Sequence, residues 1–191
     1  MERFLKTIGT DIEKAIRNDA KRVIKETEGE HIYAVSLVLD SDCISIYMAA
    51  NTKEYLENAD REYFEMCKGD LTEEEILKYE SGKAIFTKWI PDEWGYCDGD
   101  KSKLNKISNK LAKMEEKYPD KYEEQKEEII NIIINSFDRV IKSNSFDNES
   151  ITFFVSMVDS EESNDLELKS SQIFNSDVLH NIFKKERDES I

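Results

Sequence analysis

Residues 31–39, HIYAVSLVL, are the stretch from which the fold can be inferred. β-branched and aromatic side chains dominate the segment, and it is apolar on both faces of an extended chain. It is too short and too apolar all round for an exposed helix. We therefore predict a buried strand at this position.

Two further segments are predicted to form strands around it. After a turn at residues 40–42, apolar positions alternate with less apolar ones over residues 44–49, which indicates a second strand paired with the first as a hairpin. Residues 151–158 have the composition of another buried strand, and residues 84–89 can form a shorter one. The sequence thus predicts a small, mostly antiparallel sheet.

Helical periodicity occupies most of the remaining chain. Apolar residues recur at helical spacing over 3–26, 53–68 and 101–116, and over 121–142, which we expect to be the central core helix. Shorter helices are expected from residue 71 and around residues 179–183. Neither an internal repeat nor a low-complexity linker interrupts the pattern. We therefore expect a single domain, residues 1–191, of the α+β class, with the sheet packed against several helices.

The charge balance restricts the kind of partner. The 191 residues contain 27 Lys and Arg against 42 Asp and Glu, a formal net charge of −15. Such a surface repels phosphate backbones and anionic lipid, so direct binding to nucleic acid or membrane is disfavoured. A basic protein partner is favoured, because complementary fields raise the rate of encounter. Solubility alone is the simpler explanation of the same charge.

Several features favour a cytoplasmic protein. The first 19 residues have the pattern of an amphipathic helix, with no basic segment leading into an apolar one. The most apolar stretches, 129–134 and 151–158, are much shorter than the roughly 20 residues that span a bilayer. The three cysteines, Cys43, Cys67 and Cys97, are widely spaced and odd in number, which fits a reducing compartment.

Residue patterns that carry catalysis or bind cofactors are not apparent. The two histidines, His31 and His180, have no adjacent nucleophile motif, and the six glycines form no phosphate-binding loop. Clustered Cys and His for zinc are missing, and residues 159–165 lack the central Gly and terminal Glu of a calcium loop. We therefore predict no catalytic residue, no cofactor and no metal.

Residues 89–100 are the most unusual stretch of the chain. Pro91 supplies no amide donor and breaks any regular element there. Trp94 lies between acidic residues, a pattern typical of an aromatic anchor for a cationic surface, with core packing as the alternative. The acidic run 159–165 offers a second patch. The predicted partner-binding residues are Asp92, Glu93, Trp94, Asp98, Asp100, Asp159, Glu161, Glu162 and Asp165.

Four segments together resemble a known family. These are IYAVSLVLDSD, ISIYMAANT, KWIPDEWGY and ITFFVSMVDSEES with the short FNSD that follows. They are similar to the mainly bacterial family called domain of unknown function 4303. The resemblance spans nearly the whole chain and implies an α+β domain, but it supplies no activity and no catalytic residues. Its most specific part is the W-x-P-x-E-W-x-Y pattern formed by Trp89, Pro91, Glu93, Trp94 and Tyr96.

These observations favour a binding protein over an enzyme. Small acidic bacterial proteins often look like immunity proteins, so by analogy we expect an immunity protein or antitoxin that neutralises a basic cognate toxin, for instance a nuclease. One alternative is an enzyme or small-ligand-binding domain with a pocket near Glu93 and Trp94. Another is a housekeeping scaffold whose charge serves solubility.

Overall fold

The fold is that of a computed structural model and is described for residues 1–81, 87–97, 101–143, 145–146, 150–158, 160 and 163–189. Its helices and strands are those of the α+β class predicted from the sequence. The elements are α1 (Glu2–Glu26), β1 (Ile32–Leu39), β2 (Ile46–Thr52), α2 (Lys53–Cys67), α3 (Glu73–Glu80), the 3-10 turn η1 (Pro91–Glu93), α4 (Asn105–Lys117), α5 (Pro119–Glu123), α6 (Lys126–Lys142), β3 (Thr152–Met157), α7 (Ser163–Phe174) and α8 (Asp177–Glu189).

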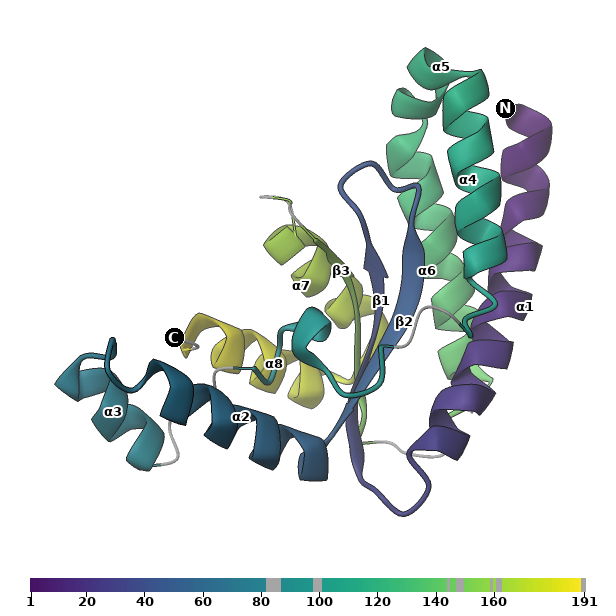
Figure 1. The fold of residues 1–191 in the computed structure, drawn as a ribbon. Coiled ribbons are helices and arrows are strands. Elements are labelled where there is room, and N and C mark those ends of the chain that lie inside the picture. Colours follow the sequence, from purple (N-terminus) through teal and green to yellow (C-terminus); the bar gives the residue numbers. More distant parts are fainter. Residues whose placement is uncertain are drawn as a thin grey trace.

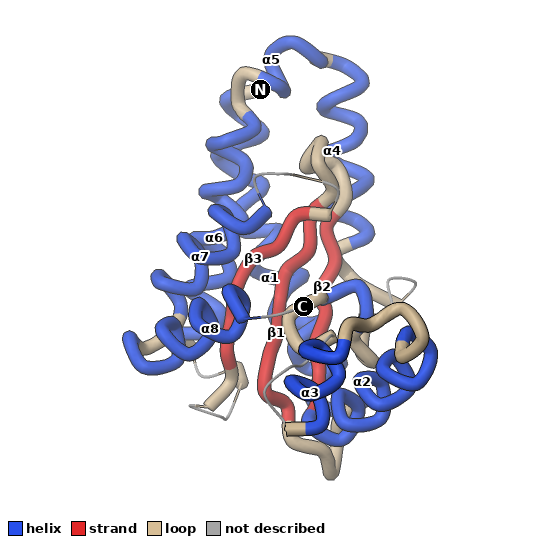
Figure 2. Tube along the Cα trace, turned by 90° about the vertical axis from the view of Figure 1, so that its left-hand side faces the viewer, coloured by secondary structure: helices blue, strands red, loops and turns tan. Residues whose placement is uncertain are grey.

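The three strands form one mixed sheet in the order β2-β1-β3. β1 and β2 pair antiparallel, with Leu37 opposite Met48, as the predicted hairpin requires. β1 and β3 pair parallel, with Leu37 opposite Val155, so the sheet is not mostly antiparallel as expected. A parallel neighbour needs a long crossover connection, and the helices between β2 and β3 provide it. Figure 2 shows β1 in the middle of the sheet.

One face of the sheet is covered by α1, α4 and α6. Alternate residues along the strands, such as Leu37 in β1 and Val155 in β3, point toward these helices and belong to the larger hydrophobic core. Ile12 of α1, Leu111 of α4 and Phe137 of α6 are fully buried in the same core. Figure 1 shows these helices side by side on one side of the strands.

The opposite face carries a smaller core that is mainly aromatic. Trp89 and Trp94 pack edge-to-face on Phe183 of α8 and on Phe154 of β3, with ring centroids 4.9 and 5.7 Å apart. Phe154 and Phe183 stack on each other at 4.8 Å. Each such aromatic pair contributes about 0.5–1.5 kcal/mol beyond the burial of its area. The turn around η1 and the helix α8 therefore form the cover of this second face.

Helix α7 closes the outer edge of β3 through side chains. Ser163 and Ser170 accept hydrogen bonds from the amides of Met157 and Val155, at 3.2 and 2.8 Å. Asn175 just beyond the helix accepts from the amide of Phe153 and donates to its carbonyl, both at 2.8 Å. Three outward-facing amides of an edge strand are thus satisfied without a fourth strand.

Several boundaries differ from those predicted. β2 starts at Ile46 and extends to Thr52, because Asp40 accepts the amides of Ile44 and Ser45 and holds them in the turn. The expected helix 121–142 is divided into α5 and α6. Of the strand expected at 84–89, residues 84–86 lie outside the described residues, and 87–89 form a turn. Helix α7 begins inside the segment interpreted as an acidic loop.

A buried carboxylate connects the first helix to the start of α4. Asp19 in α1 is 1% exposed and accepts hydrogen bonds from the hydroxyl of Ser102 and from the amides of Lys103 and Leu104, the latter two at 2.8 and 3.3 Å. Amides at the start of a helix have no partner within the helix itself. Asp19 therefore caps, from another helix, the segment 102–104 that leads into α4.

We predict that Asp19→Ala destabilises the fold by about 2–3 kcal/mol, because it removes a buried acceptor from the hydroxyl of Ser102 and the amide of Lys103. Urea unfolding measures the loss. Asp11→Ala, which removes only the half-exposed ion pair between Asp11 and Lys110 on the same two helices, should cost less than about 1 kcal/mol. Equal losses for the two variants would contradict the capping role.

Candidate functional site

Charge is unevenly distributed along the chain. Residues 1–30 and 101–143 hold 17 basic and 15 acidic residues, whereas the other segments hold 10 basic and 27 acidic residues. The first group includes α1, α4, α5 and α6, which lie together on one side of the sheet (Figure 1). On the other side, residues 53–81 alone, with α2 and α3, have ten acidic residues against four basic ones. The described segment 53–81 therefore carries a net charge of −6, ten acidic against four basic residues, on the side of the sheet opposite α1.

The predicted acidic residues fall into three groups. Asp92 and Glu93 are exposed in η1, and Asp92 accepts a hydrogen bond from the hydroxyl of Tyr47 in β2. Asp165 is exposed in the first turn of α7, where a carboxylate interacts favourably with the helix dipole. The remaining predicted positions, Asp98, Asp100, Asp159, Glu161 and Glu162, lie outside the described residues.

Trp94 is a core residue and not an exposed anchor in this structure. Only 2% of it is exposed, and its indole Nε1 donates to the carbonyl of Lys88 at 3.1 Å. Trp89 is 4% exposed, and its Nε1 donates to Glu186 of α8 at 3.1 Å. Both indoles are needed to cover the aromatic face of the sheet. The surface around η1 must therefore obtain its apolar contacts from other residues.

Helix α2 supplies those residues, because one of its apolar rows is left uncovered. Its other row faces inward, where Phe64 is buried and Asp60 accepts the amide of Thr87 at 3.1 Å. From the sequence, the apolar residues of this helix predicted an amphipathic helix without showing which of them are covered. The uncovered row, which we call the α2 stripe, consists of Tyr55 (40% exposed), Ala59, Tyr63 (37% exposed) and Met66 (73% exposed).

The turn at residues 90–95 runs beside the α2 stripe. A Cβ atom at Gly95 would lie 2.5 Å from the ring of Tyr55, so this backbone fits against the ring only because residue 95 is a glycine. Further along, the pKa of the Tyr63 phenol is raised by Cys67 beside it and also by the negative charge of Glu93. Tyr55 therefore contacts the turn that carries the predicted acidic residues, and Tyr63 is within electrostatic range of Glu93.

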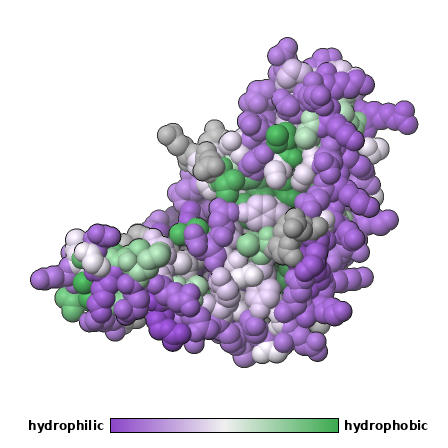
Figure 3. All heavy atoms as spheres, viewed as in Figure 1, coloured by the Kyte–Doolittle hydropathy of each residue, from purple (hydrophilic) through white to green (hydrophobic). Residues whose placement is uncertain are grey.

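These residues form one surface, which we call the α2 surface: the α2 stripe, Glu62 on the same helix, and Ile90, Asp92 and Glu93 of the turn. Ile90 is 43% exposed, and the three acidic residues are exposed. Figure 3 shows hydrophobic side chains at the outer end of the α2 and α3 arm among hydrophilic ones. An apolar centre with a charged rim is the usual anatomy of a protein interface.

Two hydrogen-bonded carboxylates fix the base of this arm. Hydrogen bonding from the ring and the amide of His31, at 2.6 and 2.9 Å, lowers the pKa of Glu54 in the first turn of α2 to about 2. Glu54 therefore stays ionised at neutral pH. Glu30 accepts from the hydroxyl of Tyr96 at 2.7 Å, and burial together with this carboxylate raises the pKa of Tyr96 to about 12.

The most buried carboxylate of the described chain with a raised pKa has a structural role. Glu167 of α7 is 2% exposed, and desolvation raises its pKa against the opposing effect of Arg187. Its oxygens accept from Ser156 of β3 at 2.6 Å and from Ser163 at 3.1 Å, and they form an ion pair with Arg187 of α8. Through these contacts, the Glu167 carboxylate joins β3, α7 and α8.

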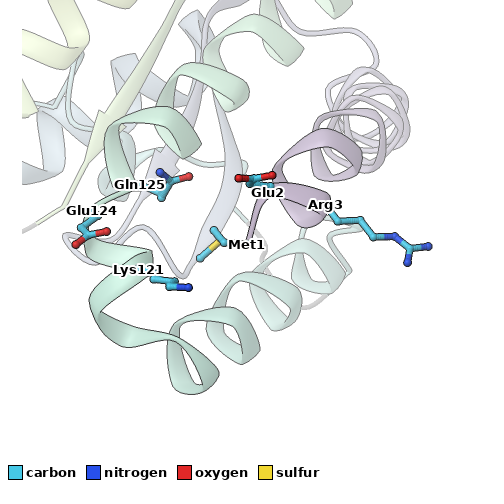
Figure 4. Close-up of a pocket in the computed structure, with 6 residues that line it drawn as sticks. All are labelled: Met1, Glu2, Arg3, Lys121, Glu124 and Gln125. Carbon is cyan, nitrogen blue, oxygen red and sulfur yellow. The ribbon is translucent and has the colours of Figure 1, made fainter.

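A surface hollow of about 470 Å³ lies far from η1 in the fold. It is lined by Met1, Glu2 and Arg3 at the start of α1 and by Lys121, Glu124 and Gln125 of the α5–α6 region. Figure 4 shows the side chain of Arg3 extending away from the others. Among its lining side chains, the cations Arg3 and Lys121 are matched by the carboxylates Glu2 and Glu124, so its charge favours neither an anionic nor a cationic ligand. It is not the pocket near Glu93 and Trp94 that the enzyme alternative requires.

In the part of the chain that the structure describes, no group of three or more His, Cys, Asp or Glu side chains is placed to hold a metal ion. Within the same ranges, every helix is too short or too polar to cross a bilayer.

We expect Arg187→Met to destabilise the protein by about 3–5 kcal/mol at pH 8, because it leaves the Glu167 carboxylate buried without its countercharge. A carboxyl whose pKa is raised above its ordinary value loses folded-state stability as pH rises through that pKa, so the variant should lose less stability as the pH is lowered to 5. Chemical unfolding at both pH values tests this. Arg139→Met, at an exposed pair with Glu13, should cost about 1 kcal/mol or less.

Gly95→Ala should destabilise the protein by about 1–3 kcal/mol, since the new methyl group overlaps the ring of Tyr55. The cost should largely disappear in a Tyr55→Ala background, which thermal unfolding of the four members of the mutant cycle can measure. Gly69→Ala is the matched control, because a Cβ atom there meets nothing within 4 Å. An unchanged cost in the Tyr55→Ala background would refute the contact.

Comparison with known proteins agrees with the geometry of the strands and of the η1 turn. No curated protein and no solved structure matches the chain. One family model matches residues 12–176, which include β1, β2, the η1 turn and β3. The chain therefore belongs to the family described as Domain of unknown function (DUF4303).

Proposed function

We propose that this chain is a non-enzymatic binding protein, a bacterial immunity protein or antitoxin that covers a basic surface of a cognate toxin. The observation that supports the proposal is the segregation of charge: α2, α3 and η1 are strongly acidic, while the helices on the other side of the sheet are close to neutral. Negative charge that served solubility alone would be expected on both sides of the molecule.

The chemistry of a nuclease-type toxin explains how such a surface inhibits. A nuclease presents Lys and Arg side chains to the phosphates of its substrate. An acidic folded surface competes for the same groove and is steered toward it, which raises the association rate by about 10 to 1,000 fold at low salt. The chain itself then needs no catalytic group and no direct contact with nucleic acid.

The apolar part of the α2 surface supplies the slow dissociation that inhibition requires. Charges at the rim of an interface change mainly the association rate, whereas buried aromatic and aliphatic anchors determine how long a complex lasts. Tyr63 and Met66 are exposed on α2, the helix that also carries the exposed carboxylates of Glu57, Glu62 and Glu65. They take the anchoring role that the sequence suggested for Trp94.

We place the encounter in the cytoplasm. Cys43, Cys67 and Cys97 are all free thiols in the structure, which suits a reducing compartment. A toxin that attacks cytoplasmic nucleic acid would be neutralised in that compartment. No cofactor or metal ion is needed for this function.

The proposal is tested by co-expressing the chain with the products of neighbouring genes and counting surviving cells. We expect one product to be toxic alone and harmless with the chain. Glu57→Gln/Glu62→Gln/Glu65→Gln should slow association with that toxin about tenfold in stopped-flow experiments, and the difference should fall as salt rises. These three carboxylates are exposed on α2.

The matched control is Glu116→Gln/Glu124→Gln/Glu128→Gln. It changes the net charge by the same amount, but at exposed positions on the α4–α6 side. We expect less than a twofold change in rate for this variant. If the chain relieves the toxicity of no neighbouring product, or if the two triple variants behave alike, the proposal is wrong.

A further inference from the structure

The α2 surface has a more specific chemistry than negative charge. Its centre contains two tyrosine rings, Tyr55 and Tyr63, each more than one third exposed, and its rim contains the carboxylates Glu62 and Glu93. Resting on the proposed function, we propose that the basic partner docks on the α2 surface with a segment that carries two arginines, one stacked on each tyrosine ring and paired with a rim carboxylate.

The spacing of the two rings defines the segment. Tyr55 and Tyr63 are eight residues apart on one side of α2, which corresponds to about 12 Å along the helix axis at 1.5 Å per residue. Two arginines eight residues apart on a partner helix span the same distance. Met66 continues the row beyond Tyr63 and is 73% exposed, so it meets an apolar side chain of the same segment one turn further on.

The chemistry of the surface favours arginine over lysine. A guanidinium group is planar, stacks on an aromatic face and presents a fork of donors to a carboxylate, whereas an ammonium group is a strongly hydrated point charge. The Tyr55 ring packs against the backbone at Gly95, two residues after Glu93, and Glu62 is next to Tyr63 on α2, so each ring has a rim carboxylate nearby. A lysine can use only one of the two groups well.

A second copy of this chain fits the surface less well. The basic row that a copy would present is on α4, where exposed side chains recur every three or four residues on one side of the helix. All of them are lysines: Lys106, Lys110, Lys113 and Lys117, with Lys103 just before the helix. Nucleic acid is disfavoured by the carboxylates of the rim, so a protein segment with arginines remains the occupant of choice.

The probe for this inference is a fluorescein-labelled helical peptide of 16 residues. It carries two arginines eight residues apart and a leucine one turn beyond the second arginine, in an alanine and glutamine background. Its twin has lysines in place of the arginines. Fluorescence anisotropy at 50 mM and 300 mM NaCl measures both affinities. We expect the arginine peptide to bind the unaltered full chain at least about fivefold more tightly than its twin.

The rings must be the source of that preference. Tyr55→Leu/Tyr63→Leu should bind the two peptides equally, with the affinity for the lysine peptide nearly unchanged. Tyr118→Leu is the matched control, because Tyr118 is 36% exposed on the other side of the molecule, and it should keep the full preference. If the double variant does not fold, Glu62→Gln/Glu93→Gln, which leaves both rings in place, should reduce the preference to about twofold or less.

Failure of this inference is distinct from failure of the proposed function. Equal binding of the two peptides to the unaltered chain, or a preference that survives both double variants, overturns the arginine site while the rescue of cells from a toxin is unaffected. Self-association of the chain that blocks the peptide and is lost in Lys106→Glu/Lys113→Glu would also overturn it, by assigning the surface to a second copy. Absence of any rescued toxin overturns the proposed function instead.

Discussion

The burial of β1 on both faces and both edges is the constraint on which the structure depends. Seven of its eight residues are buried, and it pairs with β2 on one side and β3 on the other. A three-stranded sheet this apolar cannot leave either face in water. One face takes α1, α4 and α6, and the other takes the aromatic turn with α8. The two faces of the sheet are therefore covered by different parts of the chain and by different kinds of side chain.

The difference between the two covers explains where a binding surface can arise. The α1 side is built from long helices whose solvent faces alternate charges, with pairs such as Arg17 and Glu13 or Lys142 and Asp138 on the same helix. The other side is built from α2, α8 and the turn at η1, joined by contacts such as the amide of Thr87 on Asp60. These elements leave one row of α2 exposed.

Sequence patterns predicted individual helices and strands better than the contacts that each of them makes in the fold. β-branched and aromatic composition identified β1 and β3, and helical spacing of apolar residues identified α1, because the burial of these elements is reflected in their own residues. These patterns missed α7, whose serines satisfy the backbone of β3 instead of packing in a core. Trp94 and Met66 show the same limit. Each is an apolar residue among charged ones. This local pattern does not tell whether another segment covers the side chain, as at Trp94, or leaves it exposed, as at Met66.

The closed rims of the sheet limit how the chain can recognise anything. The outward amides of β3 are taken by α7 and Asn175, and on the opposite rim Ala50 exchanges two hydrogen bonds with Tyr96 while the amide of Ile46 donates to Ser108. A foreign peptide cannot extend the ladder at these positions, and neither can a neighbouring molecule. Recognition must therefore pass through side chains, and the molecule resists the strand-to-strand stacking that begins fibril growth.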